Sequence, residues 1–192
     1  PILKYIEDPA ISFCRLKTLS LEKRFHDITL PKNSKRGNLC AGCMMINRKF
    51  ATMSFPIPEN LGNEDMWQIQ HANFFKNIIV KHISYVGLRY RLHSGNSSNK
   101  MDSFNKKNES MHKRFIVYKL FLNKYKEILS KEDINRLSSL SMAEDLRYKR
   151  KTFSIILIKN LTFSEKMRFI FYSNRALYSL RKRLFSLFSG WA

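Results

Sequence analysis

The sequence predicts an α/β protein in two parts: a mixed sheet with flanking helices over residues 1–99, then a helical extension over residues 100–192. Short segments rich in β-branched and aromatic residues predict strands. These segments cover residues 10–16, 78–82 and 85–93. An acidic pair opens a helical pattern between the first and second of them, and after residue 99 the apolar spacing becomes helical throughout.

The remaining elements of the first part follow from turn and capping chemistry. Residues 31–37 (PKNSKRG) form a polar loop, and residues 38–46 are small and apolar. Two prolines exclude a regular helix from residues 55–60. Asn63 is then placed to cap a short helix that reaches to residue 77.

The second part is predicted to hold three or four helices. Residues 101–109 are polar and resemble a linker, and apolar spacing predicts a helix over 111–129. Capping patterns predict three further helix starts. These are Ser130-x-x-Asp133, Ser141-x-x-Glu144 and Thr162-x-x-Glu165. Residues 175–191 form a basic amphipathic helix, a pattern typical either of contact with an anionic membrane or of packing on the preceding helices.

Composition limits the classes of function. The chain has 35 Lys and Arg against 15 Asp and Glu, a net charge of +20, which favours anionic partners without choosing among them. Hydrophobic residues make up 44%, too many for a disordered protein. We find no transmembrane stretch and no signal peptide, and we expect a cytoplasmic protein that contacts the inner face of the plasma membrane.

The three cysteines carry no clear chemical signature. Cys40 and Cys43 have the C-x-x-C spacing, but a zinc site needs two more ligands at suitable spacing, and the sequence does not supply them. Cys14 makes the count odd, which favours reduced thiols. We therefore expect all three to pack as small apolar residues, with redox or metal use as the alternative.

Four motifs of the first part occur in an informative order. The first is Cys40-Ala41-Gly42-Cys43-Met44-Met45-Ile46-Asn47-Arg48, followed by Phe55-Pro56-Ile57-Pro58-Glu59. The third and fourth are Asn63-Glu64-Asp65-Met66-Trp67 and Tyr90-Arg91-Leu92-His93-Ser94-Gly95-Asn96-Ser97-Ser98. This order, over residues 38–98, resembles the C-terminal half of the catalytic domain of bacterial family 2 glycosyltransferases, which have the GT-A fold.

The resemblance implies a role for each motif. It makes Asp65 the catalytic base that takes a proton from an acceptor hydroxyl, with Glu64 orienting the acceptor. Gly42, Cys43 and Trp67 would lie on the substrate side, with the ring of Trp67 against a sugar. Arg91 would bind the phosphates of the donor, and His93 would bind a divalent metal, Mg²⁺ or Mn²⁺, or the diphosphate itself.

The implied function is an inverting transfer of a sugar from a nucleotide-sugar donor to a glycan or lipid-linked acceptor in the synthesis of capsule, lipopolysaccharide or another cell-surface polysaccharide. The sequence lacks the D-x-D motif and the nucleotide-binding first half of that family. We therefore expect a partial GT-A-like sheet with an unpaired edge, α+β in this truncated form, and an enzyme that is incomplete alone.

Three alternatives remain open on the residues themselves. Glu64 and Asp65 could only complement a helix dipole, and Arg91, His93 and Trp67 could be ordinary structural residues. The charge, with aromatic residues between basic ones, suggests a nucleic-acid-binding protein, although no zinc-finger spacing or RNP pattern is present and no specific nucleic acid is expected. The missing D-x-D also leaves room for an inactive interaction protein derived from the transferase fold.

Overall fold

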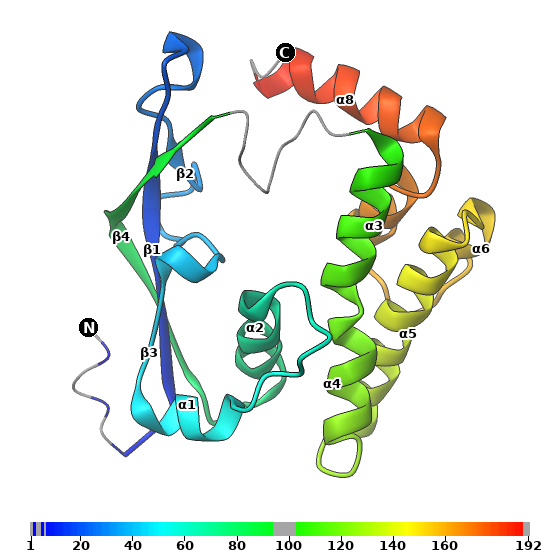
Figure 1. Cartoon of the computed structure of the whole chain (residues 1–192). Coiled ribbons are helices and arrows are strands. Elements are labelled where there is room, and N and C mark those ends of the chain that lie inside the picture. The colour runs from blue at the N-terminus through cyan, green and yellow to red at the C-terminus, as the bar shows by residue number, and fades with distance from the viewer. Residues whose placement is uncertain (1, 3–4, 6, 94–102, 190–192) are drawn as a thin grey trace. The chain divides into compact units, whose positions relative to one another are not determined.

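The computed structural model describes residues 2, 5, 7–93 and 103–189 of the chain (Figure 1). The chain divides into two compact units. The first comprises Pro1–Ile57 and Glu64–Asn99, and the second comprises Pro58–Asn63 and Lys100–Ala192. The division between residues 99 and 100 coincides with the domain boundary expected from the sequence. The short segment Pro58–Asn63 also belongs to the second unit.

The first unit is built on a four-stranded mixed sheet whose central strand is β1 (Ala10–Leu19). On one side β1 pairs in parallel with β4 (Ile79–Arg91). On the other side it pairs antiparallel with β3 (Met44–Ile46) and with β2 (Thr29–Leu30). Two short 3₁₀ turns, Lys23–Phe25 and Ala41–Cys43, belong to the connections. The predicted mixed α/β class is thus confirmed, whereas a GT-A fold stays a prediction.

Strand β4 joins two segments that the sequence analysis predicts as separate strands. Its pairing with β1 runs from Ala10↔Ile79 to Leu19↔Arg91, with register shifts near Arg15. Gly87 permits the close approach at this point, because a Cβ there would lie 2.6 Å from the Sγ of Cys14. Within the described residues no strand other than β1 pairs with β4.

Two helices lie on the crossover that leads to β4. Helix α1 (Arg48–Ser54) is not among the predicted elements, and α2 (Glu64–Phe74) is. Asn47 begins α1, since its side chain accepts a hydrogen bond from the backbone N–H of Phe50 at 2.9 Å. The same side-chain oxygen accepts from the N–H of Ala10 at 3.0 Å, so one residue joins the helix start to β1.

The second unit contains six helices in the described part of the chain. They are α3 (Phe104–Phe115), α4 (Val117–Tyr125), α5 (Lys131–Tyr148), α6 (Thr152–Ile156), α7 (Phe163–Phe171) and α8 (Arg175–Ser189). The helix starts predicted at Ser130 and Thr162 are confirmed, and Thr162 forms a full capping box with Glu165.

Four predictions about these helices are wrong. The described part of the unit has six helices where the sequence predicts three or four. The predicted linker 101–109 is helical from Phe104, because Ser103 caps α3 by accepting from the N–H of Lys106. The predicted helix over 111–129 is divided at Ile116 into α3 and α4, and α4 ends at Tyr125. Ser141 starts no helix, since it lies inside α5, and its partner Glu144 has a different role.

A buried ion network holds α3 against α5. Arg147 is fully buried and donates from Nε to Glu144 at 2.7 Å, and a second nitrogen donates to the side-chain oxygen of Asn108 on α3. His112 lies 3.0 Å from the same Glu144 carboxylate, and its ring stacks on Tyr148 at 3.9 Å between centroids. The charge of Arg147 is thus balanced by a carboxylate that is itself 2% exposed.

This network predicts a non-additive pair of substitutions. Glu144→Leu leaves the Arg147 guanidinium buried without its carboxylate, and we expect it to lower the free energy of unfolding by about 3 kcal/mol or more. Adding Arg147→Met removes the stranded charge and should recover at least about half of that loss. Urea unfolding of both variants measures these losses. A double variant that loses as much stability as Glu144→Leu alone, or more, would contradict the prediction.

Candidate functional site

The acidic pair of the third motif lies in the first turn of α2. Glu64 is exposed, whereas Asp65 is 7% exposed. The free N–H groups and the dipole of a helix start stabilise carboxylates at this position. The structure therefore places one accessible and one sheltered carboxylate side by side, at the beginning of the helix that crosses from β1 toward its parallel partner β4.

The rest of α2 is anchored in the core of the first unit. Trp67 is fully buried, and its indole N–H donates to the carbonyl of Ser54, the last residue of α1, at 2.7 Å. His71 is also fully buried, bonded to the carbonyl of Trp67 at 2.9 Å and packed edge-on against its ring. These contacts fix the rotation of α2 and hence the direction of Asp65.

The position of Trp67 corrects its predicted role. A ring that contacts a sugar must present one face to solvent, but this indole has no exposed surface. Its polar N–H is also already satisfied within the core. Trp67 therefore serves as the anchor of α2, one of the structural roles left open by the sequence analysis.

Gln68 is a site residue that the sequence analysis misses. It lies three positions after Asp65, and residues at this spacing share one helix face. Its side chain is 2% exposed, and its Oε1 has no hydrogen-bond partner among the described residues. A buried amide oxygen without a donor requires an explanation in a native protein. The spacing of Asp65 and Gln68, an acid and an amide three positions apart, is the sequence signal that could have identified Gln68.

Gly42 and Cys43 lie on the 3₁₀ turn before β3, beside β4. A Cβ on Gly42 would lie 3.0 Å from the Cδ2 of Leu88, so this turn packs closely on β4. Cys43 is buried, and burial, followed by its hydrogen bond with Cys40 and the proximity of Cys14, raises its pKa well above the ordinary value of 9.0. The structure gives Cys43 a packing role and no surface for substrate.

Arg91 and His93 lie where β4 ends. Arg91 is the last residue of the strand, paired with Leu19, and both Arg91 and His93 are exposed. The backbone N–H of Leu92 continues the pairing by donating to the carbonyl of Leu19 at 2.7 Å. The rest of the fourth motif, from Ser94 to Ser98, lies outside the described residues.

The carboxylates and the two basic residues lie at different levels of the sheet. Strand β4 has 13 residues, which at about 3.3 Å per residue span about 40 Å. Figure 1 shows α2 beside the half of the sheet where β4 begins, whereas Arg91 ends the strand. The structure therefore groups Glu64, Asp65 and Gln68 and does not place Arg91 and His93 with them.

The described residues offer no preformed metal centre. They contain no group of three or more His, Cys, Asp or Glu side chains that could hold a metal ion. The metal role of His93 stays a prediction that the described geometry does not support. The three cysteines are free and lie near one another, and Cys43 is buried, in agreement with the packing role that the sequence analysis favours.

Two pockets lie in the helical unit. The larger, of about 320 Å³, is lined by the start of α3 and the first turns of α8, and its charged residues are Arg175 and Lys182. The smaller, of about 80 Å³, lies beside His112 and Glu144. Neither pocket includes a residue of the four motifs, so neither bears on the predicted sugar-transfer site.

The first half of α8 packs as part of the helical unit. Tyr178 is buried and its ring lies 5.9 Å from that of Phe104, while Arg181 lies 4.6 Å from the ring of Tyr172. The side chains of residues 184–189 and the end of the chain, with Trp191, lie outside the described part. The apolar face of α8 therefore contributes to core packing at least as far as Tyr178.

No protein-family model, no curated protein and no solved structure matches this chain. None of the helices that the structure describes combines the length and the apolar character required to cross a bilayer. The function must therefore be argued from the motifs and from the geometry of the first unit.

The buried thiol of Cys43 predicts a pH dependence of stability. Because its pKa is raised in the folded state, folding disfavours the thiolate, and stability present below the unfolded pKa is lost as pH rises above about 9. We expect the free energy of unfolding to fall between pH 9 and 10.5 by up to about 1.4 kcal/mol per pH unit from this group. Cys43→Ala should show a shallower fall, and identical slopes in urea titrations would contradict the assignment.

Proposed function

We propose that this chain provides the acceptor side of a glycosyltransferase. The enzyme transfers a sugar from a nucleotide-sugar donor to a glycan or lipid-linked acceptor of the cell surface, on the cytoplasmic side of the membrane and with inversion at the anomeric carbon. The observation that carries the proposal is the sheltered Asp65 beside the exposed Glu64 at the start of α2. The order of the four motifs supports the same reaction.

Asp65 acts as the general base. The acceptor hydroxyl gives its proton to the Asp65 carboxylate while its oxygen forms a bond to the anomeric carbon of the donor. The bond from that carbon to the diphosphate oxygen breaks, and the nucleoside diphosphate leaves with the electron pair. A carboxylate partly withdrawn from water is a stronger hydrogen-bond acceptor than a solvated one, which suits this step.

Glu64 positions the acceptor. It is exposed beside Asp65 and can contact the acceptor sugar from the solvent side. A contact beside the base holds the reacting hydroxyl in one orientation, which contributes to the rate by proximity. Gln68 lies one turn after Asp65 on the same face, but its buried Oε1 presents no surface to a sugar.

Arg91 supports the donor side only as an exposed cation near the end of β4, suited to a phosphate. The resemblance implies Mg²⁺ or Mn²⁺ at the diphosphate, but the described residues do not form a site for it. We therefore assign no step to a metal in this part of the protein. Donor binding is expected to depend mainly on residues outside the four described motifs.

A substitution at position 65 tests the proposal. Asp65→Asn keeps the side-chain shape but cannot take a proton, so turnover should fall by a factor on the order of 10²–10⁴. Nucleoside diphosphate release from a panel of UDP- and GDP-sugars, with a lipid-linked glycan extract as acceptor, measures this.

Asp145→Asn is the matched control, because Asp145 is an exposed carboxylate of α5 outside the four motifs. It should leave turnover within about twofold of the unchanged protein. If Asp65→Asn keeps nearly full turnover with an unchanged circular dichroism spectrum, the proposed base is wrong. If the unchanged protein itself shows no turnover, the chain fits better the alternative of an inactive interaction protein derived from the transferase fold.

A further inference from the structure

The end of the helical unit exposes four large apolar side chains. Phe153 is 85% exposed, Leu157 81%, Phe163 78% and Ile156 50%. They come from the short helix α6, the residue after it and the start of α7. We call these four residues the α6–α7 patch. Large apolar side chains at this exposure, gathered at one place, are typical of surfaces that bind a partner.

The patch is held in place by the packing of its own elements. Ile155 is fully buried and Ile158 is 6% exposed, so these two side chains anchor the segment and leave their neighbours directed outward. The Nζ of Lys166 on α7 donates to the carbonyl of Ile156 at 2.7 Å, which joins the two elements. Thr162 and Glu165 cap α7 and fix the position of Phe163. The exposure thus belongs to an ordered structure.

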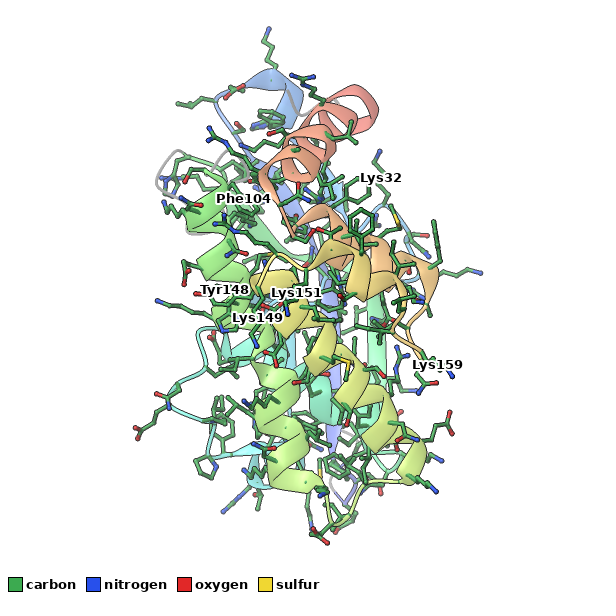
Figure 2. All side chains as sticks on the ribbon, turned by 90° about the vertical axis from the view of Figure 1, so that its right-hand side faces the viewer. Lys32, Phe104, Tyr148, Lys149, Lys151 and Lys159 are labelled. Carbon is green, nitrogen blue, oxygen red and sulfur yellow. The ribbon has the colours of Figure 1, made fainter. Side chains whose placement is uncertain are left out.

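The sequence around the patch is basic. Lys149, Arg150, Lys151 and Lys159 are the charged residues between positions 149 and 164, and all four are exposed. In Figure 2 Lys149 and Lys151 lie near the middle of the view, and Lys159 lies at its right-hand edge. The acid nearest in sequence, Glu165, accepts from Arg136 at 2.7 Å and from the N–H of Thr162 at 2.9 Å.

We infer that the α6–α7 patch inserts into the surface of a membrane that contains anionic lipids. Exposed Phe and Leu side chains surrounded by lysines fit the boundary between acyl chains and anionic headgroups, where each group finds its preferred environment. Charge complementarity selects this occupant, because an apolar protein partner would not require a basic rim. The inference does not depend on sugar transfer, although it would bring a lipid-linked acceptor near the protein.

This surface differs from the one that the sequence analysis considers. The pattern of residues 175–191 leaves membrane contact and core packing open, and Tyr178 of α8 is buried in the helical unit. The side chains of the α6–α7 patch, in contrast, are not buried against other described residues. Removal of residues 184–192 should therefore leave most of the membrane binding in place.

Vesicle co-sedimentation tests the inference. The chain should bind vesicles of phosphatidylcholine with 30% phosphatidylglycerol, and Phe153→Ser with Leu157→Ser should weaken this binding by about tenfold or more. Ile128→Ser with Met142→Ser is the matched control, since both residues are exposed and apolar but lie outside the patch. The control should stay within about twofold of the unchanged chain.

Two further measurements separate membrane insertion from other occupants. Phe153→Trp should show a blue-shifted increase in fluorescence with the anionic vesicles, and Met142→Trp should not. Lys149→Gln, Lys151→Gln and Lys159→Gln together should lower binding to anionic vesicles to the level seen with phosphatidylcholine alone. Equal binding by the Phe153→Ser, Leu157→Ser variant would overturn the inference. The inference would also be overturned if the unchanged chain did not bind vesicles and instead formed a dimer, or a complex with single-stranded RNA, that the Phe153→Ser, Leu157→Ser variant abolished.

Discussion

The hydrogen bond from the indole of Trp67 to the carbonyl of Ser54 is the contact on which the proposed site depends. It joins the end of α1 to the first turns of α2 in the buried core, where an unsatisfied N–H would be costly. His71 completes the anchor one turn later. Because α2 cannot rotate without breaking these contacts, Asp65 and Gln68 keep one orientation. A catalytic base must be held in a fixed orientation toward the group that it deprotonates.

The part of the fold set by local chemistry could be predicted from the sequence. The β-branched run at Ile78–Ile79–Val80, the prolines after Phe55 and the caps at Ser130 and Thr162 act over a few residues, and the structure agrees with them. The division at Ile116 could not be foreseen, because apolar periodicity continues through it. Nor could the continuity of β4, which Gly87 makes possible by its long-range contact with Cys14.

The candidate site was predictable only where it depends on position along a helix. An acidic pair before an amphipathic segment indicates a helix start, and the structure has one at Glu64. The same motif cannot tell a ring that binds sugar from a ring that fills a core, which is decided by the distant contact of Trp67 with Ser54. The buried Glu144 and Arg147 and the exposed Phe153 are further cases, because periodicity records apolar spacing but not what covers each face.

The central claim is that the carboxylate of Asp65 takes the proton in sugar transfer, and the pH dependence of turnover tests it most directly. A catalytic base must be ionised, so kcat/KM of the unchanged protein should fall on the acid side as this group is protonated. Asp65→Glu should keep that acid limb with an altered midpoint, and Asp65→Asn should lose it together with most turnover. An Asp65→Asn variant that keeps the same acid limb at nearly full rate would contradict the account.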